Sequence, residues 1–392
     1  MDIVLLSTAD WDNPFWTNKQ HMAVELSLNG HRVLYLESLG LRRPALRGAD
    51  LRRLWRRVTK LGKKPREVRP GLWVWSPPTV PFQGLRIVRA FNRFLLLITL
   101  RHWMRRLRLH PDMLWTYNPM TTRFLRLGKF GSSVYHCVDE IKAQPGMPRE
   151  EIEFAESELL RAVDVCFVTS THLLETRRSL NRNVHLLENV ADFSHFSKAM
   201  ESSTQVPSDL ARIAAPRIGY VGAISGYKLD LALVEAVARS RPEWSIVLIG
   251  KVGEGDPWTD VSRLEQIPNV FFLGPKDYKD LPSYLKGLDV AILPSMLNDY
   301  TRGMFPMKFF EYLAAGKPIV STDLHALRAY SNVAMLAKTR EEFVSFCEAA
   351  LEGKAVPLPT RLAVAKENTY ETRTKKMLEI LGRSKEGEGV DA

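Results

Sequence analysis

The sequence has few cysteines and no long apolar run. Its three cysteines, Cys137, Cys166 and Cys347, are far apart and show neither CxxC nor metal-ligand spacing. Cys137 and Cys166 lie within apolar, strand-like runs, which favours buried thiols in a reducing compartment. The longest apolar run, residues 94–100, is far shorter than the ~20 residues that cross a bilayer. Residues 1–6 are typical of a strand rather than a signal peptide, so we expect a cytoplasmic protein.

Two further absences restrict the classes of function. Neither half of the chain opens with a GxGxxG turn after its first strand, which disfavours a dehydrogenase. Residues 71–110 contain seven arginines and no acid, and residues 41–70 contain twelve lysines and arginines against two acids. Together they carry a net charge of +17, which leaves −6 for the rest of a chain whose total is +11. This asymmetry predicts an anionic partner.

The remaining composition is that of an ordinary folded protein. Hydrophobic residues make up 45% and charged residues 25% of the 392 residues, and this length suits two domains. Strand-like and helix-like segments alternate in both halves, which predicts an α/β fold with largely parallel sheets and ligands at the carboxyl ends of the strands. The expected strands are 2–7, 32–37, 113–117, 133–138, 165–169, 217–221, 245–249, 270–273, 290–293 and 319–321, and the expected helices include 18–29, 150–162, 231–238 and 281–288.

The most informative segment is 306–322. Lys308 and Glu311 stand three residues apart, which places them on one face of a short helix that Gly316 and Pro318 end. A carboxylate in this position could accept both hydroxyls of a ribose, and the ammonium could meet a phosphate. The alternative is an ordinary surface helix between two strands.

This segment resembles the nucleotide-sugar-binding signature of GT-B glycosyltransferases, in particular the GT4-like branch and its bacterial exopolysaccharide and teichuronic-acid-type members. The resemblance is densest in residues 217–322. It implies two Rossmann-like, doubly wound domains that face a central cleft, with Glu311 on the donor ribose. Many retaining members carry a second glutamate eight residues earlier, where this chain has Gly303. Retention and inversion therefore both stay open.

The resemblance also suggests where the domains divide. Residues 188–196 resemble the Asn-x-x-Asp…Phe stretch that closes the first domain of this family, and residues 198–215 have the polar composition of a linker. We therefore expect an acceptor-binding domain over 1–197 and a donor-binding domain over 216–360. A final helix over roughly 361–385 is expected to cross back onto the first domain.

Strand-end turns supply the other candidates for donor binding. Glycines at these turns let the backbone approach a pyrophosphate. Tyr278 follows one such turn and could stack on the base, although a partly buried loop tyrosine is the commoner outcome. The polar loop 293–306 falls where the family places its diphosphate loop. The donor candidates besides Lys308 and Glu311 are Gly222, Lys228, Gly250, Gly274, Tyr278, Asn298, Thr301 and Arg302.

The first half offers candidates for acceptor binding and catalysis. The loop 8–16 is rich in aromatic and polar residues, which suits sugar-ring stacking, but it could equally be packed beneath a helix. Its acceptor candidates are Asp10, Trp11, Asp12 and Trp16. Asp139 follows an expected strand and is the first candidate for a base or a charge-stabilising group, with His136 second and Asp10 or Asp12 as rivals. His136 lies within the strand, as core histidines do.

No metal-binding pattern accompanies these residues, because Asp10 and Asp12 flank a tryptophan in an aromatic loop. We therefore expect no metal and no cofactor. Lysines, an arginine and helix amides could stabilise the departing nucleoside diphosphate. UDP or GDP is the expected nucleotide of the donor.

The basic region 42–108 predicts peripheral attachment to the inner, anionic face of the membrane. Residues 51–58 form a basic amphipathic segment with Trp55, and residues 82–109 read as a helix. We expect its Val88, Phe91, Leu95 and Ile98 to face a sheet and its arginines to face solvent. Nucleic acid matches the charge, but no recognition motif accompanies it.

The leading hypothesis is a glycosyltransferase of polysaccharide biosynthesis that moves a sugar from a nucleotide donor to a glycan or lipid-linked acceptor. A nucleotide-sugar epimerase of the same fold is the second enzyme hypothesis, although a small soluble substrate requires no basic surface. A non-enzymatic scaffold is the third, and it predicts salt-sensitive binding to polyanions without turnover of the donor.

Overall fold

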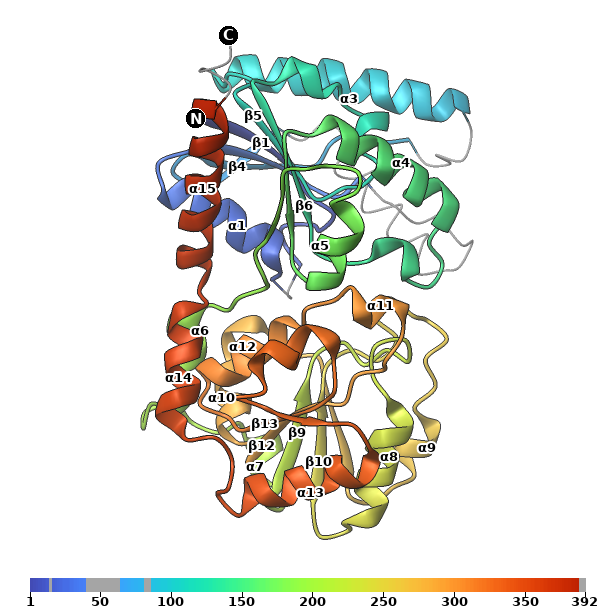
Figure 1. Cartoon of the computed structure of the whole chain (residues 1–392), viewed down its shortest axis with the longest axis vertical. Coiled ribbons are helices and arrows are strands. Elements are labelled where there is room, and N and C mark those ends of the chain that lie inside the picture. Colours follow the sequence, from blue (N-terminus) through green and yellow to red (C-terminus); the bar gives the residue numbers. More distant parts are fainter. Residues whose placement is uncertain (14–15, 40–63, 81–85, 388–392) are drawn as a thin grey trace. The chain divides into compact units, whose positions relative to one another are not determined.

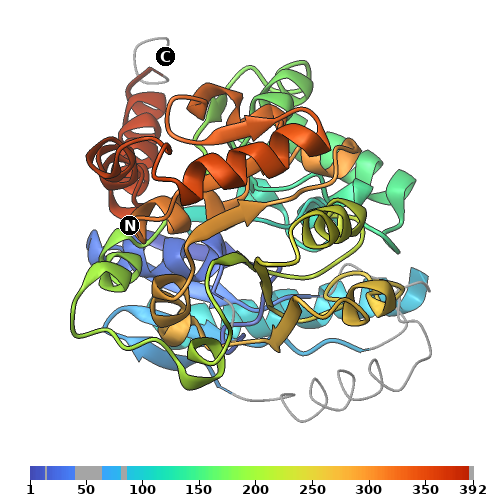
Figure 2. The same cartoon turned by 90° about the horizontal axis from the view of Figure 1, so that it is seen from below.

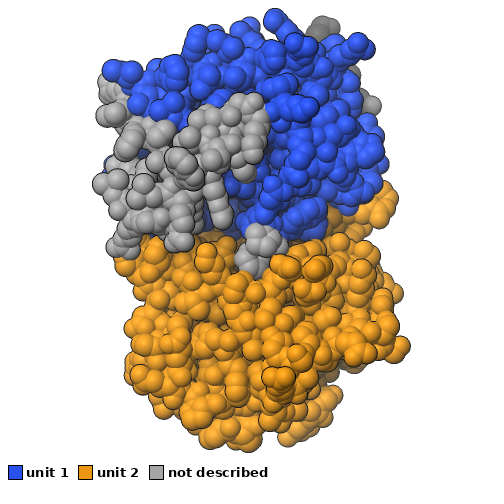
Figure 3. Space-filling model, turned by 180° about the vertical axis from the view of Figure 1, so that it is seen from behind, with its two compact units in different colours: residues 1–187, 377–392 blue, residues 188–376 orange. Residues whose placement is uncertain are grey.

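The computed structural model describes residues 1–13, 16–39, 64–80 and 86–387. The chain forms two compact units, one of residues 1–187 and 377–392 and the other of residues 188–376 (Figure 3). The division after residue 187 precedes the expected boundary at 197. The predicted basic segment 51–58 lies outside the described residues.

The first unit is built on an eight-stranded sheet with the order β3-β4-β2-β1-β5-β6-β7-β8. All neighbouring strands are parallel except β3 and β4, which form an antiparallel pair at one edge. The parallel strands are short and almost wholly buried, as expected of a sheet covered by helices on both faces. The strands are β1 Asp2–Leu6, β2 Arg32–Leu36, β3 Arg66–Arg69, β4 Leu72–Trp75, β5 Met113–Thr116, β6 Ser132–Cys137, β7 Val165–Val168 and β8 Val184–Leu186.

Helices cover both faces of this sheet (Figure 1). Met22 and Leu26 of α1, with Met377 and Leu381 of α15, pack against one face. Leu96, Leu100 and Met104 of α3 pack against the other, beside part of α4. The remaining core between β6, β7, α4 and α5 contains Cys137 and Cys166, which are buried and free as predicted. The helices are α1 Asn18–Leu28, α3 Arg86–Arg106, α4 Arg149–Ala162 and α5 Thr171–Arg177.

The predicted orientation of α3 is wrong. Phe91 and Ile98 were expected to face the sheet, yet they are 51% and 48% exposed, whereas Leu96 and Leu100 are buried. The helix is apolar on two sides, so its hydrophobic pattern alone did not indicate which side the sheet would cover.

The second unit contains a six-stranded, all-parallel sheet with the order β11-β10-β9-β12-β13-β14. Phe343 and Cys347 of α13 are buried against this sheet, and Figure 2 shows α13 alongside its strands. Together the two sheets confirm the predicted α/β class with two Rossmann-like, doubly wound units. The strands are β9 Arg217–Val221, β10 Ser245–Ile249, β11 Val270–Gly274, β12 Val290–Leu293, β13 Ile319–Thr322 and β14 Met335–Ala337.

The segment expected to be a linker is instead part of the second unit's core. Leu210 is fully buried, and Ala199 and Ile213 are 4% and 7% exposed. These apolar side chains are spaced among polar residues, so average composition hid them. The helices of this unit are α6 Phe193–Phe196, α7 Ser208–Ala211, α8 Leu231–Ser240, α9 Ser262–Glu265, α10 Leu281–Lys286, α11 Asp299–Arg302, α12 Met307–Ala314, α13 Arg340–Leu351 and α14 Leu358–Glu367.

The expected final helix is two helices. After α14 ends, Asn368 and Thr369 interrupt the helix, and the Thr369 hydroxyl accepts a hydrogen bond from the Thr372 backbone as α15 (Tyr370–Gly387) begins. α15 belongs to the second unit up to Lys376 and to the first from Met377 onward. Across the described ranges, no helix combines the length and the apolar character needed to span a membrane.

Candidate functional site

Three of the predicted glycine turns meet at one edge of the second sheet. The Gly222 N–H donates to the Ile249 carbonyl (2.9 Å), and the Gly250 N–H donates to the Gly274 carbonyl (3.0 Å). A Cβ atom on Gly250 would lie 1.7 Å from the Gly222 carbonyl oxygen, so this position excludes any side chain. The carboxyl ends of β9, β10 and β11 therefore present backbone rather than side chains, which suits the close approach of a phosphate group.

Helix α12 carries Glu311 and is fixed to this edge. The Tyr312 hydroxyl accepts from the Val221 N–H (2.8 Å) and donates to the Val221 carbonyl (3.2 Å), which fastens α12 to the end of β9. Phe309 and Phe310 are fully buried on the core side of the helix. Gly316, with φ of +72°, ends the helix in the left-handed region as expected.

Glu311 is a buried carboxylate with a single ionic partner among the described residues. The Lys308 Nζ lies 2.6 Å from Glu311 Oε2, so the predicted pair lies on one helix face. Glu311 is 3% exposed, and burial raises its pKa although Lys308 opposes the shift. Within the described ranges, Lys308 is its one hydrogen-bonding side chain. A buried carboxylate with free acceptor capacity is suited to polar hydrogens of a ligand.

Tyr278 lies close to this carboxylate and is held by His195. Their rings stack with centroids 4.4 Å apart at 11°, and His195 Nε2 lies 2.9 Å from the Tyr278 carbonyl oxygen. Burial raises the pKa of Tyr278, and the Glu311 charge adds to the shift. One face of the Tyr278 ring is therefore occupied by protein. His195 was not among the predicted site residues, although it lies in the 188–196 stretch that resembles the family.

The loop before α12 contains residues whose hydrogen bonds hold the loop in place, and it also contains an exposed cation. The Asn298 side chain accepts a hydrogen bond from the Thr301 N–H and donates one to the Tyr227 carbonyl. Asn298 and Thr301, both predicted to bind the donor sugar nucleotide, therefore cap α11 and hold the loop in place. The Lys228 Nζ lies 5.3 Å from the centre of the Tyr227 ring and 5.4 Å from that of Tyr300. Arg302 is exposed. Lys228, in the turn after β9, and Arg302, in this loop, thus remain as the phosphate candidates.

In the described part of the predicted acceptor loop, Trp11 is packed and the other candidates are at least partly exposed. Trp11 is 7% exposed, its backbone N–H donates to Glu37 Oε1 (2.9 Å), and its ring meets those of Tyr35 and Trp16 edge-on. Asp12 forms an exposed ion pair with Arg66 at 2.7 Å. The alternative of a loop packed into the core therefore holds for Trp11. Asp10 is exposed, and Trp16 is partly exposed.

The two catalytic candidates have different surroundings. His136 is fully buried among the rings of Trp115, Tyr117 and Phe167, in the manner of a core histidine. Asp139 follows the end of β6 and is partly exposed. Of the two residues, only Asp139 is accessible to solvent.

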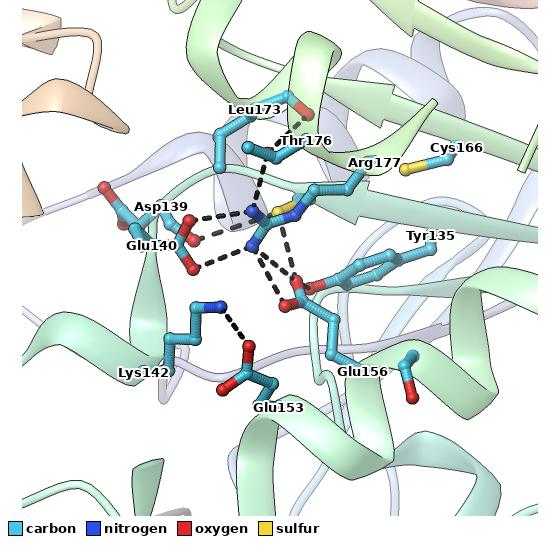
Figure 4. A network of polar contacts seen from close by, with 12 residues as sticks. Tyr135, Asp139, Glu140, Lys142, Glu153, Glu156, Cys166, Leu173, Thr176 and Arg177 are labelled. Atoms are coloured by element: carbon cyan, nitrogen blue, oxygen red, sulfur yellow. Dashed lines mark hydrogen bonds and ion pairs between the residues drawn. The ribbon is translucent and has the colours of Figure 1, made fainter. Parts of the chain in front are cut away.

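A buried ionic cluster fixes the backbone beside Asp139 (Figure 4). Both Arg177 terminal nitrogens donate to Glu140, at 2.7 and 2.8 Å, and one also lies 2.9 Å from Glu156 Oε2. The Tyr135 hydroxyl donates to Glu156 Oε1 (2.8 Å). Burial alone would lower the pKa of Arg177, but Cys137 and the two carboxylates raise it. Sequence reasoning missed this cluster, because its members lie far apart along the chain.

No cluster of three or more His, Cys, Asp and Glu side chains suited to a metal ion occurs within the described ranges. The prediction of a metal-independent site is not tested by this observation.

Comparison with known proteins identifies the domain that carries Glu311. Residues 215–352 match the family model for glycosyl transferases group 1. The chain has a group 1 glycosyl transferase domain in a GT-B fold. This confirms the resemblance predicted from residues 217–322.

One curated relative extends this similarity. It is the putative teichuronic acid biosynthesis glycosyltransferase TuaH of Bacillus subtilis, 31% identical over 181 residues. The match covers 45% of this chain and 44% of the relative, so the chain spans less than half the length of that protein.

Solved structures match the fold over nearly the whole chain. Sucrose-phosphate synthase of Thermosynechococcus elongatus has a TM-score of 0.68 at 14% identity, covering 97% of this chain and 98% of that one. Anabaena HepE in complex with UDP-glucose has a TM-score of 0.64 at 15% identity, covering 98% and 100%. At such identities the likeness establishes the fold alone.

Proposed function

We propose that this protein is a glycosyltransferase that moves a sugar from a nucleoside diphosphate donor to a glycan or lipid-linked acceptor at the cytoplasmic face of the membrane, in polysaccharide biosynthesis. The observation that carries the proposal is Glu311. It is buried, has one ionic partner, and belongs to the matched domain, on a helix fixed to the strand ends where three glycine turns meet.

In this proposal Glu311 accepts hydrogen bonds from the two ribose hydroxyls of the donor. The turns at Gly222, Gly250 and Gly274 let the diphosphate approach backbone amides, and Lys228 and Arg302 neutralise its charge. The same groups stabilise the nucleoside diphosphate as the anomeric C–O bond breaks, so no metal ion is required. Tyr278 borders the base.

We assign the reacting carboxylate of the first unit to Asp139. Its backbone is adjacent to Glu140, which Arg177 holds with two hydrogen bonds, so the position is defined before substrate binds. In an inverting reaction Asp139 would take the proton of the acceptor hydroxyl, and in a retaining one it would stabilise developing charge.

Two similarities support the proposed donor nucleotide and the proposed type of acceptor. HepE binds UDP and UDP-glucose in its solved structures, which favours UDP over GDP as the donor nucleotide. TuaH is named for teichuronic acid biosynthesis, which favours a polymeric or lipid-linked acceptor. The net charge of +17 over residues 41–110 favours attachment to an anionic membrane surface.

A thermal-shift screen with UDP, GDP, ADP, CMP and dTDP, with and without Mg²⁺, tests the donor site. We expect selective stabilisation by one nucleotide, UDP first, with no requirement for Mg²⁺. Glu311→Ala should abolish that stabilisation, while Glu367→Ala, a change at an exposed glutamate of the same unit, should leave it intact. Unchanged nucleotide affinity in Glu311→Ala would remove the central claim.

A further inference from the structure

Helix α3 exposes an apolar stripe that no described residue covers. Ile87, Phe91, Phe94 and Ile98 are 84%, 51%, 60% and 48% exposed and follow helical spacing. At 100° per residue, their centre lies on the side of α3 opposite Leu96, Leu100 and Met104, which pack in the core with the strands of the sheet. Four large apolar side chains gathered on one helix face form a patch of the kind that marks an interaction site.

A hollow runs along one flank of α3 beside this stripe. Towards the end of the helix it is a cavity of about 510 Å³ between α3 and the segment 125–130. A second cavity of about 430 Å³ lies nearer the start of the helix. Arg93 and Leu97 line both, so the two cavities are adjacent along α3, and we call them together the groove. A volume of this size accommodates a small amphiphilic ligand.

The groove combines apolar walls with cations. Leu97, Leu100, Met104, Leu125 and Phe130 supply apolar lining of the larger cavity, and among the described residues no acidic side chain lines either cavity.

Five cations line the larger cavity, and within the described ranges none of them forms an ion pair with a carboxylate; they are Arg93, Arg101, Arg105, Arg126 and Lys129. Arg89 and Arg123 of the smaller cavity are different, because both contact Glu151. The larger cavity therefore carries uncompensated positive charge over an apolar floor.

We infer that α3 and this groove bind an anionic phospholipid of the membrane surface. The lipid phosphate would be held by Arg101, Arg105 and Lys129, and its acyl chain would lie on the apolar walls. Phe94 and Ile98 would enter the membrane interface alongside. Charge complementarity selects the occupant, since uncompensated arginines beside exposed phenylalanines match an anionic headgroup on an apolar layer.

This inference rests on the proposed function for its membrane setting, but it concerns the first unit and can fail separately. A nucleic acid would use the cations and leave the apolar stripe and floor without a role. An apolar peptide would use the stripe and leave five cations unpaired. The phospholipid uses both.

The test is co-sedimentation of the full chain with phosphatidylcholine vesicles, with and without phosphatidylglycerol. We expect binding only to the anionic vesicles. Arg101→Gln/Arg105→Gln should weaken it about 30-fold, at about 1 kcal/mol per cation. Phe94→Ser/Ile98→Ser, at exposed positions that the fold does not need, should weaken it by at least about tenfold. The matched controls are Arg212→Gln/Arg263→Gln and Leu297→Ser, at exposed positions of the second unit, and these should bind as the unaltered chain does.

A second measurement separates a groove from general surface charge. Dihexanoyl phosphatidylglycerol, a soluble lipid, should bind saturably with one molecule per chain in calorimetry, whereas inorganic phosphate and dihexanoyl phosphatidylcholine should not. Leu97→Trp fills the groove and keeps every cation, so it should abolish this binding.

The inference is overturned if the unaltered chain binds both vesicle types equally. It is also overturned if Leu97→Trp binds the soluble lipid, and Phe94→Ser/Ile98→Ser binds anionic vesicles, as tightly as the unaltered chain. Nucleotide stabilisation is measured on the same preparations. Intact stabilisation with no lipid binding would reject only the lipid site, and lipid binding without nucleotide stabilisation would reject only the donor site.

Discussion

Each unit contains a buried acidic site beside a cation, and the two sites differ in how completely they are satisfied. In the first unit Glu140 and Glu156 share Arg177, and Tyr135 donates to one of them. In the second unit Lys308 is the one described residue that pairs with Glu311, and that lysine side chain is 25% exposed.

This difference separates a structural cluster from a binding site. In the Arg177 cluster the two terminal nitrogens of Arg177, both carboxylates and the Tyr135 hydroxyl bond to one another, so it can hold the backbone at Asp139 but has few acceptors left for a ligand. Within the described residues, the buried Arg177 Nε has no hydrogen-bond partner. Glu311 is equally buried, but within the described residues only Lys308 bonds to its side chain, so it keeps acceptor capacity for a ligand. A carboxylate left in that state is expected where a ligand supplies the missing donors.

The largest effect on stability should come from breaking the Arg177 cluster of the first unit. Arg177→Met leaves two buried carboxylates without a cation and should lower the free energy of unfolding by about 3–5 kcal/mol in urea denaturation. The triple variant Arg177→Met/Glu140→Gln/Glu156→Gln removes the charges together and should recover most of this loss. A single variant as stable as the unaltered chain would contradict the structural role.

The next effect concerns a half-buried cation that forms no ion pair with a carboxylate of the described ranges. The Lys317 Nζ contacts the carbonyl oxygens of Lys286 and Leu288, and burial lowers its pKa to about 8. The unfolded chain then binds more protons between about pH 8 and pH 10.5, so stability should rise with pH across that window, by up to ~3 kcal/mol in total.

Urea unfolding at several pH values checks this. Lys317→Met should flatten the rise, and Lys338→Met, at an exposed lysine, should retain it. If the free energy of unfolding rose equally with pH in both variants, the pH dependence would belong to other groups.

A smaller effect should come from changing Glu311 in the second unit. Glu311→Gln keeps the shape of the side chain but removes its charge, and should weaken nucleotide binding by about 10- to 100-fold, or about 1.5–3 kcal/mol. Because burial raises the pKa of Glu311, affinity in the unaltered chain should fall on acidification at a higher pH than for an exposed glutamate. Titration calorimetry across pH should show that dependence lost in Glu311→Gln, and its persistence would argue against ribose binding by this carboxylate.

The smallest effect should come from an exposed pair. Arg328 contacts Asp323 at 2.8 Å, but the arginine side chain is 59% exposed. Arg328→Gln should change the free energy of unfolding by less than about 1 kcal/mol, because solvent screens the interaction. A loss comparable to that of Arg177→Met would mean that burial does not explain the contrast between the two arginines.

Much of the donor site could be predicted because its residues are close in sequence. The spacing of Lys308 and Glu311 and the glycine that ends α12 are local features, and the structure has them as predicted. The roles of Asn298 and Thr301 could not be read in the same way. Both look like ligand donors in sequence, yet their hydrogen bonds close a helix cap.

The elements missed in the fold have a common cause. The edge strand β3 reads Arg-Glu-Val-Arg and is largely exposed, and the edge strands β8 and β14 have only three residues. None of them forms the buried apolar run by which the four-residue strands β5 and β7 could be predicted. The interruption at Asn368 that separates α14 from α15 likewise lies inside a run with helical composition.

The sequence by itself determined the α/β class, the strand-end positions of the glycine turns and the pairing of Lys308 with Glu311, because each depends on residues within a few positions of one another. The tertiary structure decided which face of α3 is covered, that His136 and Trp11 are in the core, and that Arg177 joins Glu140 and Glu156. These outcomes depend on side chains far apart along the chain, and burial by such distant partners leaves no period or spacing to read.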